Sequence, residues 1–151
     1  MPTLETTNVI TLTSSSSAQT LTLTGATLDI PANPVPAGQT MTVRFLVCGD
    51  LPAVVDTVHC AGVKGTTAYE VRTNAQRNNT TFAFQVGSAP NWGTTVLAKQ
   101  TVFMCSSLVS ILDPDDWTPV PDGDRIISSN RVVGAHVTGF AKNFLVFGAK
   151  P

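Results

Sequence analysis

The chain has 151 residues, and its 9 Lys and Arg against 10 Asp and Glu give a formal net charge of -1. A chain of this length can bury the core of a single domain without help from a metal or a disulfide. The small net charge, without a cluster of cations, provides no electrostatic attraction for nucleic acid or an anionic membrane. No apolar stretch is long enough to span a bilayer. We therefore expect neither nucleic acid nor a membrane among its partners.

The composition favours β-strands. The sequence contains 22 Thr and 18 Val but only 2 Glu and 4 Lys, so β-branched residues dominate and the residues that favour exposed helices are scarce. Only 13% of the residues are charged, which leaves hydroxyl and amide groups to keep the surface hydrated. Because a surface with so little charge suits permanent contacts, we expect an all-β protein that acts in an oligomer or an assembly.

Alternating apolar and polar residues predict strands along most of the chain. The predicted strands are 8–13, 19–24, 27–30, 40–48, 54–63, 67–72, 80–86, 94–98, 125–127, 131–138 and 143–147, with 102–112 as a strand or a buried irregular segment. The strongest pattern is 40–48, in which Met41, Val43 and Phe45 share one face. Three prolines in 31–39 prevent ladder hydrogen bonds and make that segment a connection. Turns are predicted at 74–79 and 87–93, and a loop at 112–125.

The regular spacing of these short strands is typical of a sandwich or barrel. We expect a single antiparallel jelly-roll β-sandwich of about eight strands over residues 8–151. Residues 1–7 have no core-forming pattern and are expected to form an N-terminal arm that becomes ordered only on a neighbouring molecule. The loop at 112–125 is rich in Pro and Asp, and loops of this length usually serve a function or an interface.

Residues 24–49 resemble a known family. A short strand runs into Ile30-Pro31-Ala32-Asn33, and the turn Ala37-Gly38-Gln39 then leads into the long alternating strand that Gly49 closes. This order resembles the entry to the jelly-roll domains of tailed bacteriophages. Those domains occur in capsid decoration (cement) proteins and in tail or head fibres, usually as homotrimers. A fibre tip would follow a coiled-coil or triple-β shaft, which this sequence lacks, so the resemblance favours the capsid-bound kind.

The resemblance implies a non-enzymatic virion structural protein that binds and stabilises the lattice of a major capsid protein as a symmetric oligomer, with a homotrimer as the expected form. Such a protein would lie on the outer capsid surface after synthesis in the host cytoplasm. This agrees with residues 1–4, which lack the basic and long apolar regions of a secretory signal. The expected contacts are the arm, including Leu4, and the loop at 112–125. The alternative is a receptor- or carbohydrate-binding jelly-roll domain of a phage tail or head fibre.

Five carboxylates fall within twelve residues of that loop: Asp113, Asp115, Asp116, Asp122 and Asp124. Hard cations prefer clustered oxygens, and the Asp-Gly-Asp at its end resembles part of a calcium loop. The register of a calcium loop and its distal Glu are missing, however, and Asp residues commonly cap turns through their own backbone. We therefore expect no metal and no other cofactor, and we retain Asp113, Asp115, Asp116 and Asp122 as interface candidates.

Trp92 and Trp117 both lie in proline-containing loops. An aromatic side chain held in a loop can anchor an interface or provide a platform for a sugar, because it buries a large area at little rotamer cost. The alternative is that both side chains fold back and cap the ends of the sandwich. Both tryptophans are candidate interface residues.

The sequence offers no set of catalytic groups. The cysteines, Cys48, Cys60 and Cys105, are odd in number and form no CxxC metal half-site. His59 and Cys60 are neighbours on a predicted strand, so their side chains point to opposite faces and cannot act as base and nucleophile. His136 is expected to be packed or hydrogen-bonded within its strand. A cupin-type enzyme would need several His and a Glu on facing strands, whereas the chain has 2 of each. We expect no enzymatic activity.

Overall fold

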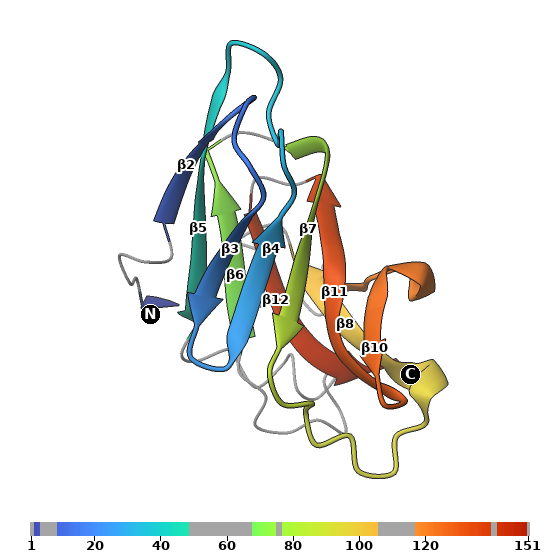
Figure 1. Cartoon of the computed structure of the whole chain (residues 1–151). Helices are drawn as coiled ribbons and strands as arrows, with labels where there is room; N and C mark the ends of the chain where they lie inside the picture. Colours follow the sequence, from blue (N-terminus) through green and yellow to red (C-terminus); the bar gives the residue numbers. More distant parts are fainter. Residues whose placement is uncertain are drawn as a thin grey trace.

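The computed structural model describes residues 2–3, 9–48, 68–74, 77–105, 117–139 and 142–150. In these residues the chain is all-β: its strands form two antiparallel sheets that pack against each other, with only two short 3-10 turns beside them (Figure 1). The prediction of an all-β sandwich is therefore confirmed. No helix among these residues has the length and apolarity needed to cross a bilayer.

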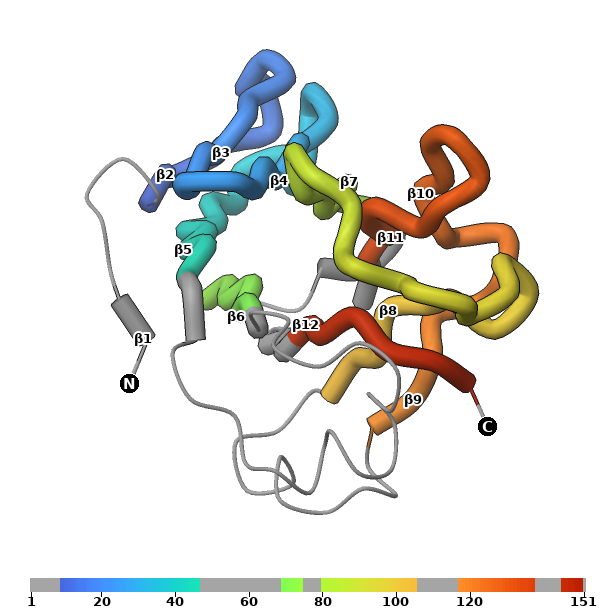
Figure 2. Tube along the Cα trace, turned by 90° about the horizontal axis from the view of Figure 1, so that it is seen from below, coloured from blue at the N-terminus to red at the C-terminus, as the bar shows by residue number. Residues whose placement is uncertain are grey.

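The strands divide into a seven-stranded and a five-stranded sheet. The larger contains β1 (Pro2–Thr3), β2 (Val9–Thr13), β5 (Thr40–Cys48), β6 (Ala68–Thr73), β8 (Gln100–Cys105), β9 (Thr118–Pro119) and β12 (Lys142–Ala149). The smaller contains β3 (Gln19–Leu23), β4 (Ala26–Ile30), β7 (Arg77–Val86), β10 (Arg125–Ser128) and β11 (Arg131–Gly139). The first has the order β5-β6-β12-β8, with β1 and β2 on β5 and β9 on β8, and the second the order β10-β11-β7-β4-β3. Figure 2 shows the two layers, with β6, β12 and β8 on one side and β4, β7 and β11 on the other.

Strand β5 has the bounds that its alternating pattern predicts. Met41, Val43 and Phe45 point into the sandwich and are buried, whereas Arg44 on the opposite face is exposed. Strands β2, β3 and β4 also begin and end within one residue of the predicted positions. One buried face thus fixes the position of each strand, since a shift by one residue would expose the apolar set.

The core lies between the two sheets and is centred on Phe84 of β7. Its ring centroid lies 5.0 Å from that of Tyr69, 5.8 Å from that of Phe147 and 6.1 Å from that of Phe45. These three partners belong to the seven-stranded sheet. Because burying one such side chain contributes about 1.5–3 kcal/mol, the aromatic cluster is a main source of attraction between the sheets.

The strand predicted at 94–98 is wrong. The chain makes a turn there, with Gly93 at a φ of 56° and the amide of Thr95 donating to the carbonyl oxygen of Trp92 at 2.9 Å. A 3-10 turn, Leu97–Lys99, follows before β8 begins. The left-handed conformation at Gly93 reverses the backbone, and the segment therefore cannot extend into a sheet.

Three other details differ from the predictions. Residues 77–79, predicted within a turn, belong to β7. The described part of the loop predicted at 112–125 contains β9, which pairs with β8, and the 3-10 turn Asp122–Asp124. A proline fits in β9 because that strand lies at a sheet edge. The described residues form twelve strands, two of them only two residues long, so the expected count of about eight is not confirmed.

Two residues of the predicted N-terminal arm pair within the chain. Pro2 and Thr3 form β1, which lies antiparallel to the end of β5. That the arm becomes ordered on a neighbouring molecule stays a prediction. The strand predicted at 54–63, with His59 and Cys60, lies outside the described residues.

Candidate functional site

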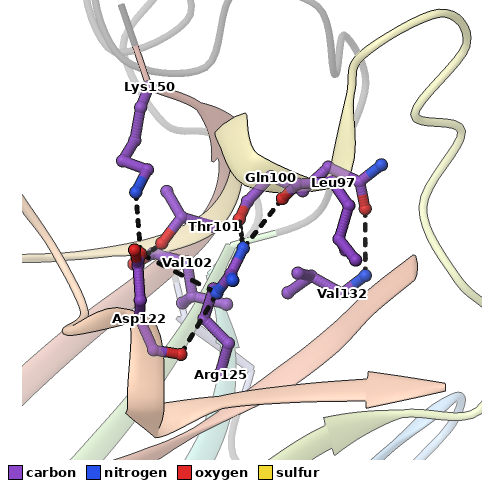
Figure 3. Close-up of polar contacts among 8 residues, drawn as sticks. All are labelled: Leu97, Gln100, Thr101, Val102, Asp122, Arg125, Val132 and Lys150. Atoms are coloured by element: carbon purple, nitrogen blue, oxygen red, sulfur yellow. Dashed lines mark hydrogen bonds and ion pairs between the residues drawn. The ribbon is translucent and has the colours of Figure 1, made fainter. Parts of the chain in front are cut away.

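Asp122 is the predicted acidic interface residue that lies within the described part of the chain. Its Oδ1 lies 2.7 Å from Nζ of Lys150 and 3.9 Å from Nε of Arg125 (Figure 3). The hydrogen bond and the charge of Lys150, and more weakly the charge of Arg125, hold the pKa of Asp122 below its ordinary value. The carboxylate is 65% exposed but already has two cationic neighbours in its own chain.

Arg125 joins this corner to the rest of the sandwich. Its Nη1 donates to the carbonyl oxygens of Leu97 at 2.8 Å and Gln100 at 3.0 Å, and its Nε donates to the carbonyl oxygen of Asp122 at 3.2 Å. One guanidinium therefore links both 3-10 turns and the start of β8, as Figure 3 shows. Since these donors and the carboxylate are used internally, we interpret the corner as a structural clamp.

Gln100 completes the clamp from inside the sandwich. Its side chain is 3% exposed; Nε2 donates to the carbonyl oxygen of Thr95 at 2.8 Å, and Oε1 accepts from the amide of Val132 at 3.0 Å. Sequence analysis identified neither Gln100 nor the role of Arg125. Their partners are mostly backbone groups remote in the chain, which no local pattern indicates.

Both tryptophans are buried, and the interface role predicted for them does not fit the structure. Trp92 has no exposed surface, donates from Nε1 to the carbonyl oxygen of Val132 at 3.0 Å and meets Phe147 edge to face. Trp117 is 2% exposed. The alternative, that both fold back onto the sandwich, is the one that agrees with the structure, because the large apolar area of an indole is better buried than exposed.

The remaining predicted interface residues, Leu4, Asp113, Asp115 and Asp116, lie outside the described residues and stay predictions. Among the residues that the structure does describe, no three His, Cys, Asp or Glu side chains gather where they could hold a metal ion. His136, expected to be packed or hydrogen-bonded, is exposed on β11. This strand alternates, and His136 lies on its outer face.

The outer face of the five-stranded sheet is rich in hydroxyl and amide groups, and we call it the hydroxyl face. Its members are Thr20, Thr22, Thr27, Asp29, Thr81, Ala83, Gln85 and His136. Strand register places Thr22, Thr27 and Gln85 in one row, and Thr20, Asp29, Ala83 and His136 in the next. A shallow depression of about 490 Å³ follows the second row. Ala83 lies between Asp29 and His136, and its small side chain explains why the surface of the sheet is lower at this point.

The outer face of the seven-stranded sheet has a different character. Leu46, Phe103 and Val146 lie on it and are buried, although they point away from the core between the sheets. Glu70, opposite Leu46 in register, is 1% exposed, and its Oε1 lies 2.6 Å from Nε of Arg72. Sequence analysis did not anticipate a second buried face or this ion pair. The alternation of 67–72 did indicate that Glu70 and Arg72 lie on the same face, because residues two apart on a strand share a face.

A comparison of the chain with protein-family models, curated proteins and solved structures finds no match.

Proposed function

We propose that this chain is a non-enzymatic virion structural protein, a capsid decoration (cement) protein that binds a capsid lattice as a symmetric oligomer and stabilises it. The observation that carries the proposal is the hydroxyl face. It presents Thr and Gln side chains across β3, β4 and β7, and among its eight members Asp29 is the only carboxylate. The resemblance of residues 24–49 to phage jelly-roll domains supplies the class of assembly.

Such a face suits docking onto a protein lattice. Hydroxyl and amide groups exchange hydrogen bonds with water for hydrogen bonds with a partner at a smaller desolvation cost than charged groups do. The one carboxylate, Asp29, already accepts a hydrogen bond from Thr20 Oγ1 at 2.7 Å. Contacts of this kind are individually weak, but a symmetric oligomer that engages several lattice subunits multiplies their effect.

The proposed partners are further copies of this chain, with a homotrimer as the expected form, and the major capsid protein. The proposed location is the outer capsid surface. A role without catalysis is supported by the clamp, where Asp122, Arg125 and Lys150 bind one another and backbone groups instead of facing a cleft. The carbohydrate-binding alternative loses its support because both indoles that could serve as a sugar platform are buried.

The jelly-roll winding is part of the proposal. It is supported by the frequency with which consecutive strands change sheet, namely at β2 to β3, β4 to β5, β6 to β7, β7 to β8, β9 to β10 and β11 to β12. Jelly rolls wind two Greek keys over a pair of sheets, and that winding requires repeated crossing. An experimental structure whose connections contain no Greek key would contradict this part.

Co-sedimentation with empty capsids of the same source tests the function. The protein should pellet with the shells to a fixed stoichiometry and raise their melting temperature. Binding should weaken little at high salt, because few charges take part. Thr27→Arg and Gln85→Arg should abolish binding by placing a guanidinium on the hydroxyl face. Ser88→Arg, in the exposed segment after β7, is the matched control and should bind as the parent does. If the parent protein never pellets with the shells, the proposal is wrong.

A further inference from the structure

We propose that the outer face of the seven-stranded sheet binds a small oxyanion in a recess between β5 and β6. The recess has a volume of about 220 Å³ and is lined by Thr42, Arg44, Arg72, Thr73 and Asn74. Pockets for drug-sized ligands are larger, about 300–1,000 Å³. The site is independent of the proposed virion role, since it lies on the sheet opposite the hydroxyl face.

Two arginines face each other across the recess. Arg44 and Arg72 are direct register partners on β5 and β6. Like charges directly opposite each other destabilise a sheet. Two arginines side by side on adjacent strands therefore favour an anion that lies between their charges.

The described strands of the sheet provide one carboxylate beside these two arginines. Glu70 binds Arg72 through Nε, which leaves the Nη groups of Arg72 able to donate to a ligand. In the described part of the chain Arg44 takes part in none of the ion pairs, which are those of Arg72, Arg125 and Lys150. The ion pair with Glu70 thus orients the guanidinium of Arg72. The charge of Arg44 has no counterion among the described residues.

The neutral groups of the recess also favour an anion. The Oδ1 of Asn74 accepts a hydrogen bond from the amide of Thr42 at 2.9 Å, so its Nδ2 is the group left to donate. The hydroxyl of Thr42, which lies 3.4 Å from that of Thr11, can donate to a ligand when it accepts from Thr11. None of the described residues that line the recess is a carboxylate. Two guanidinium groups with an amide and a hydroxyl are donors suited to a carboxylate, sulfate or phosphate.

Amide NMR spectra of the labelled full chain test the site. The protein is titrated separately with sulfate, phosphate and acetate while chloride keeps the ionic strength constant. We expect saturable shifts confined to the amides of the residues that line the recess: Thr42, Arg44, Arg72, Thr73 and Asn74. Saturation by sulfate or phosphate alone identifies a tetrahedral oxyanion, and saturation by acetate too identifies a site that also accepts carboxylates, such as acidic side chains. Shifts that do not saturate, or that chloride reproduces, would overturn the proposal.

Charge-neutral variants show whether the recess is responsible. Arg44→Gln should weaken binding about tenfold, the effect of one charge-assisted hydrogen bond. Because Arg44 is exposed, the variant should fold normally. Arg131→Gln removes an exposed arginine at the start of β11 and should leave the affinity unchanged. Equal affinities for the parent and Arg44→Gln would exclude the recess as the binding site.

Discussion

The indole Nε1 of Trp92 donates a 3.0 Å hydrogen bond to the carbonyl oxygen of Val132, forty residues further along the chain. Both residues have no exposed surface. The bond ties the segment after β7 to the start of β11. The rings of Trp92 and Phe147, which lies on β12, also meet edge to face. A buried carbonyl that loses its donor is costly, so this one bond makes the loop part of the core.

Trp92→Phe should lower the free energy of unfolding by about 2–3 kcal/mol, because it removes the hydrogen bond and part of the buried ring. Urea unfolding measures the change. Val96→Ala lies in the same segment, but Val96 is 59% exposed, so that variant should change stability by less than about 0.5 kcal/mol. Similar losses in the two variants would show that the indole is not held as described.

Gly134→Ala should destabilise the fold by about 3 kcal/mol or more. A Cβ at Gly134 would overlap the carbonyl oxygen of Phe84 and lie 2.8 Å from Cα of Gln85, so β11 would have to move away from β7. Gly123→Ala is the control, because a Cβ there meets no atom within 4 Å. Thermal unfolding of the two variants should differ clearly, and equal melting temperatures would contradict the close approach of the strands.

Arg72→Ala should cost about 2–3 kcal/mol, because it leaves the Glu70 carboxylate buried without a counterion. The figure is reduced for solvent screening, since the Arg72 side chain is 38% exposed. The Oε2 of Glu70 is buried and, among the described residues, has no hydrogen-bond partner that could compensate. The double variant Glu70→Leu, Arg72→Ala should recover part of the loss in a double-mutant cycle. Strictly additive losses would mean that the pair is not coupled.

Lys150→Gln should raise the pKa of Asp122 toward its ordinary value of 3.8. In the folded parent the pKa lies below that value, so pairing with Lys150 stabilises the fold above pH 3.8 and this contribution is lost as the pH falls through the folded pKa. Carboxyl NMR titration measures the shift, which added salt should reduce because Asp122 is exposed. Lys99→Gln should leave the titration of Asp122 unchanged.

Tyr69 is the single tyrosine of the chain, which makes its titration easy to follow by ultraviolet absorbance. Burial raises the pKa of the phenol above its ordinary value of 10.0. The neutral phenol thus stabilises the fold below pH 10, and this contribution is lost as the pH rises through the folded pKa. Ionisation of the folded protein near pH 10.0, as in a free tyrosine, would show that the ring is solvated.

Several strands could be predicted from the sequence because a one-sided core imposes a period of two. In β5 the polar and apolar residues alternate from Thr40 to Phe45, and both strand ends agree with the prediction. The segment 94–98 also contains Thr and Val but bends at Gly93. Strand propensity alone does not show that a backbone turns, since the turn depends on the conformation of a single glycine.

The candidate site was harder to predict than the fold. Because Trp92 lies in a proline-containing loop, the sequence suggests a position near the surface. Its burial depends on Val132 and Phe147, which are remote in the chain. The recess at Arg44 and Arg72 depends on strand register, which a single sequence does not provide. The spacing of Glu70 and Arg72 was visible, because residues two apart on a strand share a face.

Strand β12 lies between β6 and β8, although it is the last of the described strands in chain order. During synthesis the seven-stranded sheet can therefore close only after residues 142–149 have left the ribosome. Until then β6 and β8 each present an unpaired edge, which is a template for pairing with another nascent chain. Closure of this sheet is accordingly expected to wait for β12, and a chaperone that shields strand edges should raise the yield of native protein.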